Sequence, residues 1–335
     1  MLIDMHAHVV PDGLPAGPGD RWPRVEEADG ARALVSGQMR LPLQEAWFDA
    51  ERRLAAMDAN GVDAEVVSPL PPLLNYRVPP ADAVRLCRGV NAFIARLCEV
   101  SPSRFYGLGT VPMQDPDLAA AELTEVRAMG LHGIEIGSNV CGTSLGDDRF
   151  LSFFQEAARL GVPVFVHSLD PTIADRLPPA AMAGFGFAAE VSIAAASLVA
   201  SGTIERCPDL RLAFSHGAGG FPLMLTRAQW FHTGAWNEEP ASGPPPGPPG
   251  AARLPCSPSE YARRFWYDTL VFDRRALRYL VDMLGPRQLL IGTDFPAMAR
   301  EQPAGRTLRE LGLPADVLED VTWHNCFRFL GTAPR

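Results

Sequence analysis

Short apolar runs recur along the chain, and most are followed by a longer segment with helical periodicity. Continuous apolar runs of this length are typical of strands that are buried on both faces, as in parallel sheets. We therefore expect strands at Leu2–His8, Ala64–Pro69, Tyr106–Val111, Gly133–Gly137, Val162–His167, Leu210–His216, Phe265–Leu270 and Gln288–Asp294.

The segments between these runs place apolar residues three and four positions apart, which is the pattern of an amphipathic helix. Gly61 follows the first of these segments and suits a C-cap, because glycine readily adopts the left-handed conformation. Helices are expected at Glu51–Asn60, Pro80–Val100, Pro116–Met129, Arg149–Leu160, Ala188–Cys207 and Asp273–Leu284. Strands alternating with helices along most of the chain predict an α/β fold, a TIM-type (β/α)8 barrel. A doubly wound parallel sheet is the alternative.

Two segments interrupt this alternation, within what we expect to be one domain over residues 1–335. Residues 9–48 directly follow the first strand and are rich in Gly, Pro and charge. Barrels place substrate-covering loops at this point, so we expect an insertion of lid loops here. Residues 240–258 contain a Pro- and Gly-rich stretch and predict a surface loop.

Composition excludes several kinds of chemistry. The formal net charge is −9, which argues against a protein that binds nucleic-acid phosphates with a basic face. All 30 basic residues are arginine. Without lysine the protein has no Schiff-base or pyridoxal-phosphate anchor, no P-loop lysine and no carboxylated lysine to bridge two metal ions.

The chain carries no pattern for export or membrane insertion. Its N-terminus lacks a basic region followed by a long apolar region, and the apolar stretches are too short or too interrupted to span a bilayer. The six cysteines are scattered and form no C-x-x-C pair. We therefore expect a cytoplasmic protein with reduced thiols and no membrane partner.

Five side chains that can bind metals or carry protons fall at the ends of predicted strands. His6 and His8 end the first strand, and residues two apart on a strand project to the same side. His167, His216 and Asp294 end the fifth, sixth and eighth strands. The carboxyl ends of the strands carry the active site in barrels of this kind, so this grouping predicts a catalytic centre.

Three imidazoles and one carboxylate suit a divalent ion, with zinc first and manganese, iron or cobalt as alternatives. Such an ion lowers the pKa of bound water from 15.7 to about 7 and so supplies hydroxide at neutral pH. Because no lysine is available to bridge a second ion, we expect a single metal ion.

Several motifs resemble those of the amidohydrolase superfamily, and within it the α-amino-β-carboxymuconate-ε-semialdehyde decarboxylase (ACMSD) family. The resemblance covers nearly the whole chain, in order and at suitable spacing. The matching segments are Ile3–His8, Met57–Asp63, Arg104–Gln114, Phe165–His167, Phe214–Pro222 and Ile291–Pro296.

The resemblance implies a distorted (β/α)8 barrel that holds one zinc ion. His6, His8, His167 and Asp294 match the metal ligands of the family, and His216 matches the histidine that handles protons beside the metal-bound water.

Arginines of the family bind the carboxylate of the substrate. Arg227 matches an arginine that reaches into the site of the neighbouring subunit, which implies a homodimer. Arg40 matches the arginine that holds the substrate carboxylate within the same chain, although the alignment there needs a gap.

The pocket segments depart from the family pattern. Ser168 and Leu169 stand where the kynurenine-pathway decarboxylase has Pro and Trp, so a wide planar surface is lost. After the second strand, an aromatic-rich stretch is replaced by one that brings a new guanidinium group, Arg77. We therefore expect the reaction type to be kept and the substrate to differ.

We predict a metal-dependent, O2-independent decarboxylase (a carboxy-lyase) of a small unsaturated or aromatic carboxylic acid. The metal and an arginine would hold the carboxylate, because the planar guanidinium group pairs with it bidentately. A metal-dependent hydrolase or hydratase of a lactone, amide or enoate is the alternative, because fold and ligands alone do not separate these reactions. An inactive scaffold that keeps the fold is a third hypothesis, and the intact set of ligands argues against it.

Overall fold

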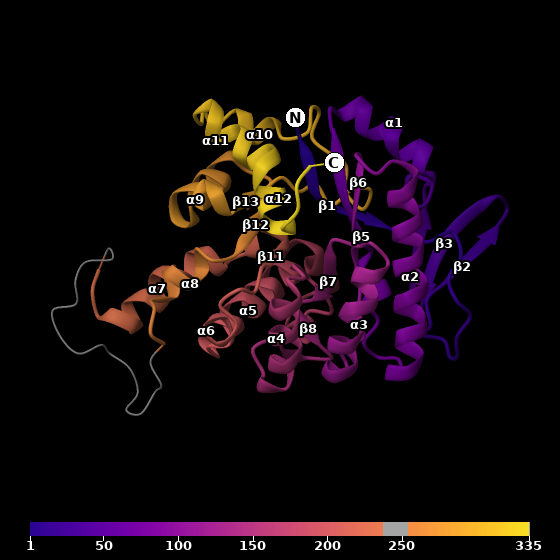
Figure 1. The fold of residues 1–335 in the computed structure, drawn as a ribbon, viewed down its shortest axis with the longest axis horizontal. Helices are drawn as coiled ribbons and strands as arrows, with labels where there is room; N and C mark the ends of the chain where they lie inside the picture. The colour runs from indigo at the N-terminus through magenta and orange to yellow at the C-terminus, as the bar shows by residue number, and fades with distance from the viewer. Residues whose placement is uncertain (237–253, 335) are drawn as a thin grey trace.

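The computed structural model describes residues 1–236 and 254–334. Eight parallel strands form one sheet in the order β1-β5-β6-β7-β10-β11-β12-β13 (Figure 1). They are β1 (Ile3–Val9), β5 (Ala64–Pro69), β6 (Phe105–Gly109), β7 (Gly133–Gly137), β10 (Val164–His167), β11 (Leu212–Phe214), β12 (Trp266–Asp268) and β13 (Leu289–Leu290).

The last strand returns to the first and closes the sheet. The amide of Met5 donates to the carbonyl oxygen of Ile291 over 2.7 Å, and the amide of His8 donates to that of Phe295 over 2.7 Å. Ala7 also forms a parallel bridge with Phe295. The fold is therefore the predicted (β/α)8 barrel, and the doubly wound alternative is wrong because an open sheet would leave these two edges apart.

Helices surround the barrel (Figure 1). Gly61 ends the first helix in the left-handed conformation, with φ 69°, as predicted. The expected helix Ala188–Cys207 is broken after Ala200, where Gly202 has φ 73°. The helices are α1 (Ala50–Asn60), α2 (Pro80–Val100), α3 (Pro116–Ala128), α4 (Leu151–Leu160), α5 (Phe187–Ala200), α6 (Thr203–Arg206), α7 (Phe221–Thr233), α8 (Pro258–Ala262), α9 (Arg274–Leu284), α10 (Arg306–Arg309), α11 (Ala315–Glu319) and α12 (Asn325–Leu330).

Two buried clusters divide the core. The larger lies between the strands and the surrounding helices and includes Ile134 and Ile136 of β7. The smaller joins side chains from six barrel strands, such as Met5 and Phe165, with Phe327 of α12. Because side chains alternate along a strand, this smaller cluster fills the inside of the barrel.

The segment 9–48 contains more regular structure than the expected lid loops. Three antiparallel strands, β2 (Arg24–Ala28), β3 (Ala31–Ser36) and β4 (Met39–Leu43), form a small sheet beside the barrel (Figure 1). Within these strands only Ala33, Leu34 and Val35 are buried. Of the predicted loop 240–258, residues 240–253 lie outside the described residues.

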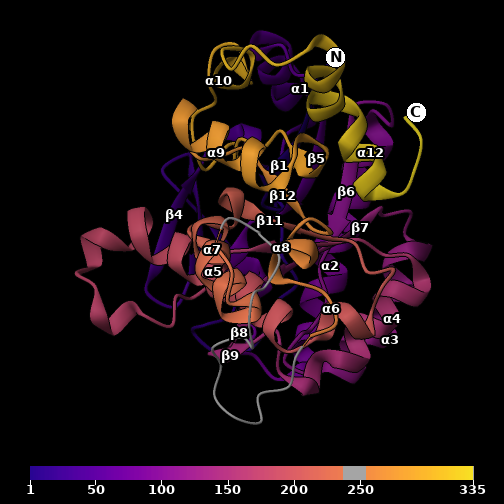
Figure 2. The ribbon, with the colours of Figure 1, turned by 90° about the vertical axis from the view of Figure 1, so that its left-hand side faces the viewer.

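One helical run differs from the expectation that no apolar stretch is long enough to cross a bilayer. Pro179–Ala200 joins two short helical turns to α5, and by length and composition it qualifies as a span. In the fold, Val191, Ala194 and Leu198 of α5 are buried in the protein core. Figure 2 shows α5 beside α7 and α8. Packing within the protein therefore accounts for part of this composition, while Phe185 and Ile193 of the same run are 70% and 38% exposed.

Candidate metal centre and active site

The first strand delivers two imidazoles to the inside of the barrel. Its pairing with β5 shifts register between Asp4 and Ala7, which marks a bulge. A bulge changes the side to which the following side chains point. Met5 lies in the barrel interior, and His6 and His8 also point inward, where both are fully buried.

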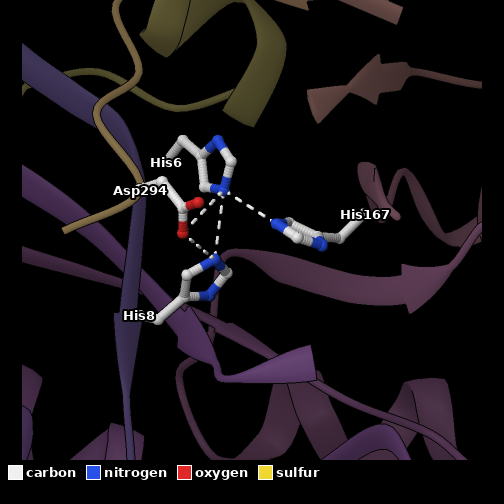
Figure 3. A group of neighbouring side chains, drawn as sticks. All are labelled: His6, His8, His167 and Asp294. Carbon is white, nitrogen blue, oxygen red and sulfur yellow. Dashed lines mark hydrogen bonds and ion pairs between the residues drawn. The ribbon is translucent and has the colours of Figure 1, made fainter. Parts of the chain in front are cut away.

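Four side chains from three places in the chain meet at this point (Figure 3). The Nε2 atom of His6 lies 3.0 Å from Nε2 of His8 and 3.0 Å from Nε2 of His167. Oδ1 of Asp294 lies 3.2 Å from Nε2 of His8. All four ligand atoms lie within 4.8 Å of one another. Zinc–nitrogen bonds of about 2.0–2.1 Å allow two ligand atoms to lie up to about 4.2 Å apart, so small side-chain shifts bring all four atoms within reach of one ion.

The hydrogen bonds on the far side of each ring fix its tautomer. Nδ1 of His6 faces the carboxylate of Asp268 at 2.6 Å, Nδ1 of His8 faces the carbonyl oxygen of Pro69 at 3.1 Å, and Nδ1 of His167 faces the carbonyl oxygen of Ser168 at 2.9 Å. These oxygens only accept, so each Nδ1 carries the proton. The three Nε2 lone pairs therefore converge, and this donor set fits a divalent metal ion.

The site favours one positive charge, on His6, and disfavours a second, because the pKa values of His8 and His167 are lowered. Burial lowers the pKa of His6, but the hydrogen bond to Asp268 and the charge of Asp294 outweigh it and raise the pKa to about 9. Burial and the neighbouring His6 lower the pKa of His167. The pKa of Asp294 is held below its usual value because the surrounding imidazoles outweigh the effect of burial. A metal cation meets the same preference without a proton.

Asp294 lies beyond its strand, contrary to the expectation that it ends one. The strand β13 stops at Leu290, and Asp294 takes the left-handed conformation with φ 58°. Its amide donates to the carbonyl oxygen of His6 over 2.7 Å. This bond between the first and last segments of the barrel places the carboxylate beside the imidazoles.

His216 also lies beyond its predicted strand, in a tight turn. The strand β11 ends at Phe214, and His216 follows in η7 (Ser215–Ala218) with φ 52°. Its ring centroid lies 5.3 Å from that of His6 and 5.4 Å from that of His167. Burial lowers its pKa. The side chain therefore stands beside the metal ligands without being one of the four converging groups.

A cavity of about 1060 Å³ opens above this cluster. His167, His216 and Asp294 form part of its wall, and most of the remaining wall is apolar, including Leu70, Phe187 and Met298. It is large enough for a small organic acid, because ligand pockets commonly measure about 300–1,000 Å³.

The predicted arginines occupy three different environments. Arg77 lines the cavity and pairs with Asp170 at 3.2 Å. Arg40 lies on β4 outside the cavity wall, and its guanidinium pairs with Glu26 at 2.6 Å. Arg227 lies on α7 in a separate hollow of the same chain, over the ring of Phe231. A further arginine, Arg21, lines the cavity.

Three residues near the site were not recognised from the sequence. Asp268 and Glu135 are fully buried acids inside predicted strands, and an acid within an apolar run is a signal that could have found both. Neither oxygen of Glu135 has a hydrogen-bond partner among the described residues, and one lies 3.7 Å from Nδ1 of His8. No local pattern distinguishes the third residue, Arg21, from other surface arginines.

A buried cluster of three histidines and an aspartate at the mouth of a (β/α)8 barrel defines a metal-dependent enzyme of the amidohydrolase type. The family model described as Amidohydrolase matches residues 3–332. The chain therefore belongs to the amidohydrolase family.

Known relatives point to one reaction class. The chain is 30% identical to 2-amino-3-carboxymuconate-6-semialdehyde decarboxylase of Dictyostelium discoideum, over 100% of this chain and 92% of the relative. The crystal structure of 5-carboxyvanillate decarboxylase from Sphingomonas paucimobilis has a TM-score of 0.75 and 31% identity, over 84% of this chain and 83% of that chain.

A third protein shares the fold at lower identity. The dihydroxybenzoic acid decarboxylase from Polaromonas sp. JS666, solved with bound manganese, has a TM-score of 0.71 and 22% identity, over 84% of this chain and 85% of that chain. Together these findings confirm the predicted resemblance and the predicted class, a metal-dependent decarboxylase of the amidohydrolase superfamily.

Proposed function

We propose that the protein removes CO2 from a small unsaturated or aromatic carboxylic acid, with one divalent ion held by His6, His8, His167 and Asp294. The observation that carries this proposal is the convergence of three Nε2 atoms and one carboxylate oxygen at the base of a largely apolar cavity. Relatives that act on a carboxymuconate semialdehyde and on carboxyvanillate support the substrate class.

The ion supplies positive charge that holds a carboxylate, together with acidity for a bound water. Zinc is our first choice because the donor set is rich in imidazole. Manganese is our second choice because the Polaromonas decarboxylase was solved with that ion bound.

His216 is the residue we assign to proton transfer. It stands beside the metal ligands on the wall of the cavity, within reach of a bound substrate. When the bond between the carboxylate and the substrate carbon breaks, its electron pair stays on that carbon. CO2 leaves, and the electron pair forms a C–H bond with a proton that His216 passes on. Because burial lowers the pKa of His216, its imidazole is neutral near pH 7, so it would take up a proton from water in the site before passing one to that carbon.

Arg21 and Arg77 are the arginines that we expect to bind the remaining polar groups of the substrate. Both line the cavity. Arg77 is held by Asp170, while no side-chain partner of Arg21 occurs among the described residues. Arg40 stays a prediction from the resemblance alone, since its guanidinium is engaged by Glu26.

We also infer a homodimer in which Arg227 serves the site of the partner subunit. Arg227 does not line the cavity of its own chain. Along α7, the neighbouring Leu223, Met224 and Phe231 are 68%, 44% and 42% exposed, which leaves an apolar helix face for a second copy to cover. A cytoplasmic location stays a prediction of the sequence.

The direct test is to supply the zinc- or manganese-loaded protein with candidate carboxylates and to trap CO2. The panel contains 2-amino-3-carboxymuconate semialdehyde, 5-carboxyvanillate and dihydroxybenzoates, each under oxygen-free conditions. We expect CO2 from at least one of them in a metal-dependent manner. Turnover of lactones, amides or enoates without CO2 release from any acid would favour the hydrolase or hydratase instead.

A further inference from the structure

Asp268 joins the two parts of the site through a single carboxylate. Its Oδ2 atom accepts the Nδ1 proton of His6 over 2.6 Å. Its Oδ1 atom accepts from the amide of Gly217 over 2.9 Å and from the amide of Leu270 over 3.1 Å. One oxygen therefore serves a metal ligand, and the other serves the turn that carries His216.

The turn at His216 needs such support. His216, Gly217, Ala218 and Gly219 all have positive φ, at 52°, 59°, 56° and 56°. This conformation is unfavourable for residues that carry a Cβ atom, so it persists only where the surroundings fix it. The bond from the Gly217 amide to Asp268 lies directly next to His216 and anchors the turn.

The pair formed by His6 and Asp268 is tightly enclosed. Both side chains are fully buried. A Cβ atom at Gly292 would lie 2.7 Å from Cβ of Asp268 and 2.8 Å from Cβ of His6, so only glycine lets the backbone pass there.

The geometry points to Asp268 as a positioning residue that fixes the tautomer of His6 for metal binding and holds the His216 turn against the same site. The inference deepens the proposed function and rests on its metal site. It predicts that metal affinity and the placement of His216 depend on one carboxylate through two different oxygens.

The substitution Asp268→Asn separates the two roles. The amide oxygen of asparagine can still accept from Gly217 and Leu270, but its NH2 group then faces Nδ1 of His6. His6 must accept at Nδ1, so its proton moves to Nε2 and blocks the metal-binding lone pair. Asp268→Ala removes both contacts. Glu122→Gln is the matched control, because Glu122 is a buried carboxylate that pairs with Arg88, away from the site.

We expect Asp268→Asn to weaken zinc binding by about 10–100-fold, as measured by competition with a chelator, while the Gly217 amide stays protected from hydrogen exchange. At saturating zinc, its kcat should return toward that of the wild type. Asp268→Ala should weaken zinc binding too, expose the Gly217 amide to exchange and keep a low kcat at saturating zinc. Glu122→Gln should change none of these readings.

The inference is overturned if Asp268→Asn binds zinc as tightly as the wild type. Should the variants not fold, ¹⁵N NMR of the zinc-loaded wild type decides instead, and a His6 ring bound to zinc through Nδ1 would refute the inference. Wild-type protein that binds no zinc or manganese would refute the proposed metal site itself, which is a different result.

Discussion

The amide of Asp294 donates a hydrogen bond to the carbonyl oxygen of His6 over 2.7 Å, although the two residues come from opposite ends of the barrel sequence. The same contact closes the ring of strands and brings a carboxylate to the imidazoles. Closure of the barrel and the placement of Asp294 therefore depend on the same junction. A change that loosens this junction is expected to affect both.

The proposed proton carrier can be tested separately from metal binding. His216→Ala should keep the metal content of the wild type, because His216 is not among the four converging ligands. Its kcat should fall by about 10²–10⁴-fold, the usual contribution of a positioned acid or base. Elemental analysis and CO2 release measure the two effects. Activity close to that of the wild type would remove His216 from the reaction.

Substitution of the arginines tests which of them bind the substrate. Arg21→Gln and Arg77→Gln should each raise KM by about tenfold, equivalent to about 1.4 kcal/mol, because both residues line the cavity. Arg32→Gln is the control, since Arg32 lies on β3 outside the cavity wall and pairs with Glu27 of β2. A rise in KM with Arg40→Gln alone would favour the assignment from the resemblance.

The proposed sharing of Arg227 between subunits predicts complementation. His216→Ala and Arg227→Ala should each be nearly inactive alone. In a mixed dimer, one site combines an intact His216 with the intact Arg227 of the partner, so random mixing should restore about a quarter of wild-type activity. If Arg227 acts within its own chain, mixing restores nothing.

The sequence predicts those site residues that a local pattern of apolar and polar positions marks. His6, His8 and His167 are predictable because they lie at the ends of apolar runs, where a barrel gathers its side chains. The bulge in β1 and the left-handed turns at His216 and Asp294 depend on contacts between distant segments, and no local signal announces them.

The residues that support the site were harder to foresee. From the sequence, Asp268 and Glu135 are simply acids within apolar runs that predict strands. Only the structure shows that each lies beside an imidazole. The small sheet β2–β4 was missed for a related reason. Met39, Leu41 and Leu43 of β4 do alternate along the strand, but the three strands are only five or six residues long and lie in a segment rich in Gly, Pro and charge, which favoured loops.

A buried ion cluster next to the site predicts how stability varies with pH. Glu65 pairs with Arg53 and Arg300, and these charges outweigh burial and lower its pKa below the ordinary 4.5. A lowered pKa contributes stability that is complete above about pH 4.5 and is lost as pH falls through the folded-state value. Glu65→Gln should therefore cost about 3–5 kcal/mol near neutral pH, because two buried guanidinium groups lose a partner.

Chemical denaturation at a series of pH values measures this cost. The difference between wild type and Glu65→Gln should be constant from pH 7 to about 5 and shrink below that. A difference that grows as the pH falls would show that Glu65 is protonated in the folded protein.

The central claim is that His6, His8, His167 and Asp294 hold one divalent ion. Anomalous diffraction from crystals of the zinc- or manganese-loaded protein, recorded on both sides of the metal absorption edge, tests it most directly. The account predicts one strong peak per chain, between the three Nε2 atoms and the carboxylate of Asp294. Loaded crystals with no peak there, or with the ion bound by other side chains, would contradict it.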